Sequence, residues 1–260
     1  GLKLKRLGGT SMTSRIVGLI PARAGSKRVP NKNVLRIQGH PLLAYTISAA
    51  LDSGVFEKVI VSTDSEEYAQ IALHYGAEVP FLRPNSLAQD SSADIGWVAH
   101  ALENLALIGY EFEIFSILRP TSPFRNASTI RRAYEEFSSR TDIDSIRAVE
   151  LCSQHPGKMW RIKGDHLIPL LSVQPDGLDW FSSPTQSLPE VWVQNASLEI
   201  AFSRCVLESE SISGSRIAPF KTVFPEGIDI NSEFDFAKAK MVVDEGLFSP
   251  PEVRVDPYRF

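Results

Sequence analysis

Short apolar runs alternate along the chain with segments that carry apolar residues at helical spacing. Residues 16–20 (Ile-Val-Gly-Leu-Ile) predict a buried strand. Residues 41–52 place apolar side chains at positions 42, 43, 47, 50 and 51, which predicts an amphipathic helix that ends at Gly54. The same alternation predicts strands at 58–62, 78–82, 113–118 and 144–149, and helices at 65–75, 92–107 and 126–139.

This alternation predicts a mostly parallel sheet with helices on both faces, a three-layer α/β/α Rossmann-like fold. Ligands of such sheets bind at the carboxyl ends of the strands. Polar residues follow several of the predicted strands, and we expect them to share one rim: Arg23, Asp64, Arg83, Arg119 and Asp229.

Residues 151–193 interrupt the pattern and are rich in Pro, Ser and Trp. Two strand-like runs, 159–162 and 167–171, flank Gly164 and predict a hairpin. We interpret 151–193 as a lid or dimerisation excursion. The chain then returns to the sheet at 196–202, adds a strand near 220–224 and ends with a helix at 233–245. One domain of residues 15–150 and 194–260 is therefore predicted, preceded by a disordered leader or cloning scar at 1–14.

Composition narrows the classes of partner. The chain has 260 residues and a net charge of −4, which suits one large domain and argues against a nucleic-acid binder. No apolar run is long enough to span a membrane, so no membrane partner is expected. Cys152 and Cys205 fit neither a disulfide framework nor a zinc site. We expect reduced thiols in a cytoplasmic protein with a small anionic substrate.

The loop after the first predicted strand, residues 21–33, carries the strongest chemical signal. It lacks the P-loop and dinucleotide-binding glycine patterns. Gly25 and Ser26 allow backbone N–H groups to converge on anionic oxygens, and the following helix can direct its N-terminus to the same place. Two guanidinium and two ammonium groups suit phosphate oxygens: Arg23, Arg28, Lys27 and Lys32. The loop predicts a polyphosphate site.

Six motifs in this chain occur in a characteristic order. They are 21–33, Val61-Ser62-Thr63-Asp64, Leu82-Arg83-Pro84, Leu87-Ala88-Gln89-Asp90, Arg119-Pro120-Thr121-Ser122-Pro123-Phe124-Arg125 and Gly227-Ile228-Asp229-Ile230-Asn231. The set resembles the acylneuraminate (CMP-sialic acid, nonulosonic acid) cytidylyltransferase family. That resemblance implies a homodimeric, Mg²⁺-dependent nucleotidyltransferase that transfers CMP from CTP to a sugar acid, releases pyrophosphate and serves glycan synthesis.

The resemblance also implies roles for individual positions. Nucleotide binding is implied for Ala22, Arg23, Gly25, Ser26, Lys27, Arg28, Lys32, Asn33, Arg83 and Asp94. Metal binding is implied for Asp229 and Asn231, where the family usually has Asp-x-Asp and where oxygen ligands suit Mg²⁺. Catalytic roles, through alignment and charge neutralisation, are implied for Arg23, Lys27, Lys32 and Asp229.

The acceptor side departs from the family's pattern. Arg119 replaces the usual Gln, Thr185 stands at a usual Arg position, and Glu199 adds a carboxylate. Acceptor binding is predicted for Arg119, Thr121, Ser122, Gln194, Asn195 and Glu199. Two alternatives stay open: the same fold activating a sugar 1-phosphate or phosphonate, also with another NTP, or an inactive nucleotide-binding module, which Asn231 motivates.

Overall fold

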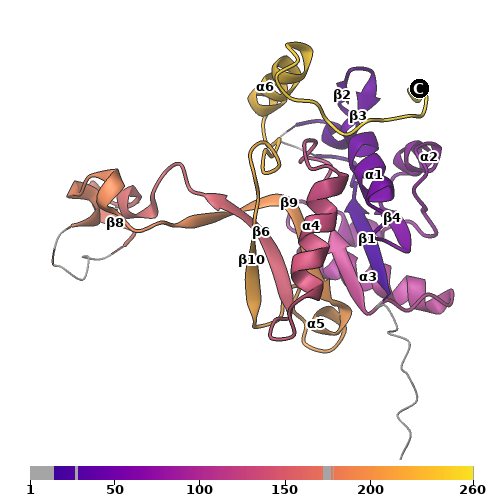
Figure 1. The fold of residues 1–260 in the computed structure, drawn as a ribbon, viewed down its shortest axis with the longest axis horizontal. Helices are drawn as coiled ribbons and strands as arrows, with labels where there is room; N and C mark the ends of the chain where they lie inside the picture. Colours follow the sequence, from indigo (N-terminus) through magenta and orange to yellow (C-terminus); the bar gives the residue numbers. More distant parts are fainter. Residues whose placement is uncertain (1–14, 27–28, 172–176, 178, 260) are drawn as a thin grey trace, which may run out of the picture.

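The central sheet of this computed structural model, which describes residues 15–26, 29–171, 177 and 179–259, is mixed but mostly parallel (Figure 1). Its strands are β1 (Ile16–Pro21), β4 (Lys58–Ser62), β5 (Ile114–Ile117), β6 (Ser145–Leu151), β9 (Trp192–Phe202) and β10 (Ile217–Lys221). They lie in the order β10-β6-β9-β5-β1-β4. β1 is parallel to β4 and β5, and β6 is parallel to β10. Only β9 runs antiparallel to its neighbours in this sheet.

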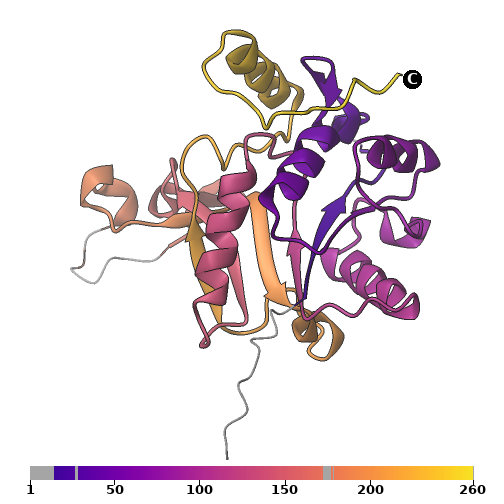
Figure 2. The ribbon, with the colours of Figure 1, turned by 45° about the vertical axis from the view of Figure 1, so that its right-hand side comes forward.

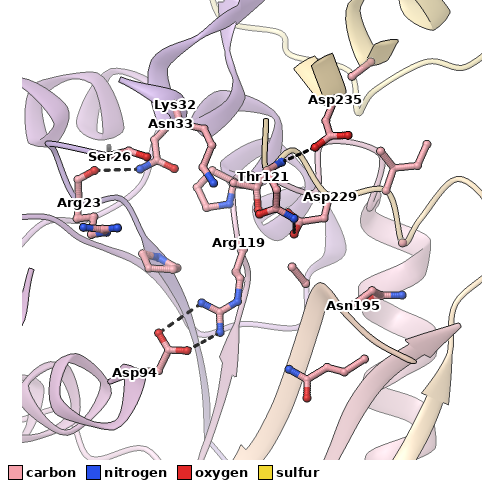
Figure 3. Close-up of a pocket in the computed structure, with 18 of the residues that line it drawn as sticks. Arg23, Ser26, Lys32, Asn33, Asp94, Arg119, Thr121, Asn195, Asp229 and Asp235 are labelled. Carbon is pink, nitrogen blue, oxygen red and sulfur yellow. Dashed lines mark hydrogen bonds and ion pairs between the residues drawn. The ribbon is translucent and has the colours of Figure 1, made fainter. Parts of the chain in front are cut away.

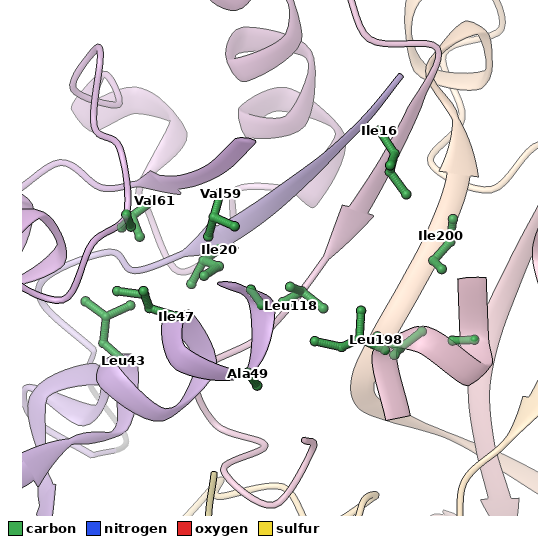
Figure 4. Close-up of a cluster of buried hydrophobic side chains, with 14 of the residues drawn as sticks. Ile16, Ile20, Leu43, Ile47, Ala49, Val59, Val61, Leu118, Leu198 and Ile200 are labelled. Atoms are coloured by element: carbon green, nitrogen blue, oxygen red, sulfur yellow. The ribbon is translucent and has the colours of Figure 1, made fainter. Parts of the chain in front are cut away.

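Helices cover both faces of the sheet, as the three-layer prediction requires (Figure 2). Residues of β1 alternate between the faces, because successive strand side chains point to opposite sides. Ile16 and Ile20 face helices α1 (Leu42–Ser53), α2 (Glu66–His74) and α4 (Ala127–Ser138), and Figure 4 shows Ile47 beside Ile20. Val17 and Leu19 face α3 (Asp94–Leu107) and α5 (Ser203–Leu207).

A third apolar cluster attaches the last helix, α6 (Glu233–Asp244), at the end of the sheet where β1 ends (Figure 1). Val243 of α6 and Ile230 pack against Ile37, Leu42 and Tyr45. Ile37 belongs to a small hairpin of β2 (Arg36–Ile37) and β3 (His40–Pro41), which precedes α1. The cluster therefore holds α6 close to the carboxyl ends of the central strands.

Beyond the sheet, β6 and β9 continue to pair as far as Leu151 and Trp192 and carry an arm that projects from the body (Figure 1). The arm holds the predicted hairpin, β7 (Trp160–Lys163) and β8 (His166–Pro169), and short turns at Pro156–Lys158, Trp180–Ser182 and Thr185–Ser187. Gly164 has φ +60°, which the tight turn requires. The ring of Trp160 lies 4.4 Å from that of Phe181, so the arm has its own aromatic packing.

One predicted strand, at 78–82, is wrong. The ends of the other predicted strands and helices shift by a few residues. Residues 78–82 form a single bridge between Glu78 and Ile60 rather than a strand. Pro80 lacks the N–H that a further ladder bond needs. β9 begins four residues before the predicted return at 196, because its first residues pair with β6 in the arm. The division of the chain at 150 and 194, and the nature of residues 1–14, stay predictions; residues 1–14 lie outside the described residues.

Two further observations complete the fold. Among the described residues, no helix has the length and apolar character needed to cross a bilayer. Cys152 and Cys205 are both free thiols, and burial raises the pKa of Cys205 above its ordinary value.

Two leucines on α3 test the packing of the second face. Leu105 is fully buried and Leu107 is 82% exposed. We expect Leu105→Ala to lower the free energy of unfolding by about 2–5 kcal/mol, because it leaves a cavity between α3 and the sheet. Leu107→Ala on the same helix is the matched control and is expected to change it by less than about 0.5 kcal/mol. Denaturant unfolding measures both; equal effects would contradict the described orientation of α3.

Candidate active site

A cleft of about 960 Å³ lies at the carboxyl ends of the central strands, between the loop after β1, the start of α3, the base of the arm and α6 (Figure 3). Most of the predicted site residues line it: Arg23, Ser26, Lys32, Asn33, Arg83, Asp94, Arg119, Thr121, Gln194, Asn195, Asp229 and Asn231. Four do not: Ala22, Gly25, Ser122 and Glu199. Lys27 and Arg28 lie outside the described residues. The structure thus brings segments from five parts of the chain to one place.

Backbone and side-chain hydrogen bonds hold the loop after β1 at the cleft. Ala24 N donates to Asp64 Oδ1 at 2.8 Å, and Asn33 Nδ2 donates to the carbonyl oxygen of Arg23 at 3.1 Å. Gly25 has φ +74°, a conformation that favours glycine. The helix predicted at 41–52 is α1, and a 3-10 turn, η1 (Lys32–Val34), and the β2–β3 hairpin lie between it and the loop. Asp64, which follows β4, thus holds the backbone of the loop through Ala24 and does not itself line the cleft.

Two cations of this loop extend toward the cleft. Arg23 forms an ion pair with Asp90 at 2.6 Å and donates to the carbonyl oxygen of Ala88 at 3.2 Å. Lys32 points into the cleft between Arg23 and the segment that carries Asp229 (Figure 3). Both are long side chains with charged ends, which suits an extended anion.

Arg83 forms part of the cleft wall and is only 4% exposed. Its Nε donates to Ser62 Oγ at 3.0 Å and its Nη2 to Ser62 O at 2.8 Å. Its guanidinium lies over the ring of Trp97, 4.9 Å from the centroid. Burial lowers the pKa of Arg83 to about 10, so the group remains a cation at neutral pH. Arg83 and Trp97 are therefore a stacked, nearly buried pair that forms part of the cleft wall.

Arg119 lies on the cleft floor between two carboxylates. Its Nη2 is 2.8 Å from Asp94 Oδ2 and 3.2 Å from Glu199 Oε1. Burial lowers the pKa of Arg119, but the two carboxylates outweigh it and hold the pKa above its ordinary value. Burial raises the pKa of Asp94, and Arg119 more than offsets this, so Asp94 is ionised at neutral pH. The predicted nucleotide residue Asp94 and the predicted acceptor residue Arg119 therefore meet in one ion pair.

The segment 227–231 forms the opposite wall. Ile230 N donates to Thr121 O at 2.9 Å, which ties this segment to the turn after β5. Oδ1 of Asp229 is buried and has no hydrogen-bond partner, whereas Oδ2 accepts from Asn231 Nδ2 at 2.6 Å. Asn231 N and Ser232 N donate to Asp235, which forms a capping box with Ser232, the N-cap residue of α6.

The donors at Asp229 fit a magnesium ion held jointly with a substrate. Within the described ranges there is no group of three or more His, Cys, Asp or Glu able to hold an ion alone. Mg²⁺ is commonly bound by one or two carboxylates, with phosphate and water oxygens completing its shell. The unpartnered Oδ1 of Asp229 supplies one such oxygen. Exchange of the amide oxygen and nitrogen of Asn231 would place its oxygen beside Oδ2 of Asp229, as a second, uncharged oxygen ligand.

Close packing near the arm fixes a second set of residues. Asn195 Nδ2 donates to Thr222 Oγ1 at 2.9 Å and to Glu150 Oε2 at 3.2 Å. A Cβ on Gly227 would lie only 2.1 Å from Glu150 Oε2, so any larger residue there would displace the Glu150 carboxylate from Asn195. Gln194 also lines the cleft, and its Oε1 accepts from Arg147 Nη1 at 2.6 Å.

Sequence reasoning missed several residues of the cleft and its support. Asp90, Glu150, Asp235 and Lys238 line it. Asp90 closes the motif Leu87-Ala88-Gln89-Asp90, which is a signal that could have found it, whereas the other three lie outside the six motifs. Arg125 lies beneath the floor and is fully buried. A signal was available for Arg125, since it closes the Arg119–Arg125 motif, but nothing in that spacing indicates burial.

Glu226 offers a test of how the wall that carries Asp229 is held. Its side chain is 9% exposed and accepts from Arg132 at 2.8 Å, Thr129 and Val223 N. Burial raises the pKa of Glu226, but these donors lower it by more, so the net pKa lies below its ordinary value. A depressed folded-state pKa stabilises the protein above the unfolded pKa of about 4.3, and this stabilisation disappears as pH falls through the folded value.

We expect Glu226→Gln to cost about 1.5–3 kcal/mol at pH 7, because charged hydrogen bonds are lost, and clearly less at pH 3. Denaturant unfolding of both proteins at the two pH values measures the difference. A cost that is the same at pH 3 and pH 7 would contradict an ionised Glu226 at neutral pH.

This chain is similar to known proteins in sequence. A family model described as cytidylyltransferase matches residues 17–153. The CMP-N,N'-diacetyllegionaminic acid synthase of Legionella pneumophila is 35% identical over 231 residues, which cover 88% of this chain and 97% of that protein. The N-acylneuraminate cytidylyltransferase of Escherichia coli is 35% identical over 228 residues, which cover 88% of this chain and 52% of that protein, so the chain spans about half of that relative.

Solved structures share the fold. CMP:2-keto-3-deoxy-manno-octonic acid synthetase complexed with CTP is similar with a TM-score of 0.65 at 14% identity, covering 90% of this chain and 100% of that chain. Two findings agree on the family. The family model covers more than half of the chain, and the Legionella relative is 35% identical over 88% of it. The protein therefore belongs to the cytidylyltransferase family and is a nucleotidyltransferase.

Proposed function

We propose that this protein transfers CMP from CTP to a sialic-acid-like, nonulosonic sugar acid, with Mg²⁺ and release of pyrophosphate. The observation that carries the proposal is the meeting of Arg23 and Lys32 with Asp229 across one cleft (Figure 3). Cations on one wall and an unpartnered carboxylate oxygen on the other suit a metal-bound triphosphate. The names of the relatives, which include a legionaminic acid synthase and an acylneuraminate cytidylyltransferase, support the acceptor class.

The proposed nucleotide site occupies the part of the cleft between the loop after β1 and α3. Arg23, Ser26 and Lys32 bind the triphosphate, with Lys27 and Arg28 of the same loop, and Arg83 with Asp94 bind near the base and ribose. Arg23 then exchanges its ion pair with Asp90 for phosphate oxygens. The exposed position of that pair makes the exchange inexpensive, since surface ion pairs contribute little free energy.

The proposed reaction is an in-line displacement at the α-phosphorus. The acceptor hydroxyl oxygen forms a bond to this phosphorus, the α–β phosphoanhydride bond breaks, and the hydroxyl proton leaves to solvent. Asp229 and Asn231 hold the Mg²⁺, which when bound supplies positive charge for the departing pyrophosphate. Lys32 and Arg23 neutralise the charge of the pyrophosphate from the side of the loop after β1. Neither side chain forms a covalent bond to the substrate.

Asp229 is the residue whose loss tests this reaction most sharply. We expect Asp229→Asn to lower pyrophosphate release from CTP and a nonulosonic acid about 10²–10³-fold and to raise the Mg²⁺ concentration required, because a charged oxygen ligand is lost. Asp165→Asn, in the exposed turn of the arm, is the matched control and is expected to retain activity. Unchanged rate and Mg²⁺ requirement in Asp229→Asn would remove Asp229 from the site.

We further propose that the protein is a cytoplasmic homodimer joined through the arm. The free state of Cys152 and Cys205 supports a reducing compartment. The arm hairpin exposes several apolar side chains, including Ile162 at 79% and Leu167 at 58%, and a second copy of the chain would cover them.

Substitution in the hairpin tests the dimer. We expect Ile162→Glu to convert the protein to a monomer, because a charge at this position would be buried without a partner. Leu107→Glu, at an equally exposed position on α3, is the control and is expected to remain dimeric. Light scattering coupled to size-exclusion chromatography measures the mass; a monomeric parent protein at micromolar concentration would contradict the proposal.

A further inference from the structure

Four charged side chains form a row on and behind the cleft floor. Asp94 and Arg119 are 2.8 Å apart, Arg119 and Glu199 3.2 Å, and Glu199 and Arg147 3.1 Å. Arg119 follows the end of β5, and Figure 3 shows its side chain directed toward Asp94. Two guanidinium groups and two carboxylates alternate along the row, so its net charge at neutral pH is zero.

Glu199 does not face the cleft. Its side chain is 9% exposed, and its Oε1 and Oε2 are taken by Arg119 and Arg147. It is absent from the residues that line the cleft, whereas Arg119 and Asp94 line it. Glu199 therefore affects a substrate only through Arg119, which makes it a positioning residue.

Arg119 offers hydrogen-bond donors to the cleft without offering net charge. Asp94 and Glu199 occupy its Nη2, and Nη1 makes a longer bond to Asp94 of 3.4 Å, so Nε and an Nη1 hydrogen remain. Gln194 extends the same surface, since its Oε1 accepts from Arg147 and leaves its amide N–H groups as donors. Both residues line the cleft, so it has these donors in its lining, while the neighbouring carboxylates already accept from Arg119.

We propose that Arg119, neutralised by Asp94 and Glu199, is a specificity-determining residue that binds an uncharged oxygen of the acceptor, a hydroxyl or a carbonyl, and disfavours a phosphate group there. The inference rests on the proposed function, because it names what the acceptor presents at this site. A phosphorylated acceptor would bring a dianion to a row in which two carboxylates offset the attraction of Arg119 and Arg147, so its desolvation would gain no net charge attraction there. The acceptor is therefore a sugar acid that is not phosphorylated at this position.

Inorganic phosphate is a probe that does not depend on catalysis. We expect Glu199→Gln to bind inorganic phosphate at Arg119, at least tenfold more strongly than the parent protein does there, because Arg119 and Arg147 lose a shared counter-charge. Calorimetry measures this as a phosphate site beyond those of the parent protein. Glu57→Gln removes a carboxylate from the Arg15 pair, an exposed contact of 2.6 Å, and is the matched control. Phosphate binding in Glu199→Gln equal to that of the parent would overturn the proposal.

Asp94→Asn repeats the test at a more exposed carboxylate, with a side chain 41% exposed, should Glu199→Gln fail to fold. The same gain of a phosphate site is expected, since Arg119 again keeps only one counter-charge. Phosphate binding unchanged from the parent in Asp94→Asn would overturn the proposal as well.

Steady-state kinetics separate the acceptor from the nucleotide. We expect Arg119→Gln to raise the KM for the sugar acid about tenfold, the loss of one hydrogen bond, and the KM for CTP by a smaller factor, because Asp94 loses its ion-pair partner. The parent protein is expected to prefer a sugar acid over a phosphorylated acceptor by tenfold or more. A preference for the phosphorylated acceptor, or a rise confined to the KM for CTP, would overturn the inference.

The inference and the proposed function fail in different ways. Failure of the protein to release pyrophosphate from CTP with any sugar acid would overturn the proposed function. The phosphate titration would still show whether Asp94 and Glu199 neutralise Arg119.

Discussion

A single buried guanidinium joins the elements that form the cleft floor. Arg125 is fully buried, and its Nη1 donates to the carbonyl oxygens of Ser197 and Arg119, the latter at 3.2 Å, while its Nη2 donates to Thr46 Oγ1 at 3.0 Å. It therefore connects the turn after β5, strand β9 and helix α1. Burial lowers the pKa of Arg125 to about 9, so it stays charged at neutral pH and keeps all its donors. A buried cation that satisfies backbone carbonyls fixes their positions, because leaving them unpaired is costly.

The cleft floor depends on the contacts of Arg125, because one of the carbonyl groups that Arg125 binds belongs to Arg119. The carbonyl of Arg119 is held by Arg125 and its guanidinium by Asp94 and Glu199. The next residues of the turn reach the metal wall through the bond from Ile230 N to Thr121 O. One short turn thus positions the acceptor side and the wall that carries Asp229, so displacement of the turn would disturb both.

Strand and helix order was predictable from the sequence because each apolar run has a clear period, as in residues 16–20 and 41–52. The pairing of β9 antiparallel to both β5 and β6 was not, because the order and direction of strands depend on contacts distant in the sequence. Residues 78–82 were predicted wrongly because apolar character outweighed Pro80 in the pattern. At the site, Arg23 and Asp229 were identifiable from their motifs, whereas the burial of Glu199 and Arg125 follows only from packing. Glu199 had been expected to face the acceptor, and its two guanidinium partners lie too far away in the chain to have been inferred.

The most direct test of the account is the choice of nucleotide. Purified protein is incubated with Mg²⁺, a panel of nonulosonic acids and each of the four ribonucleoside triphosphates in turn, and pyrophosphate and the nucleotide-sugar product are quantified. Pyrophosphate and a CMP-linked sugar acid are expected in equal amounts with CTP and at least one acid of the panel. Turnover with GTP or UTP but never with CTP would contradict it.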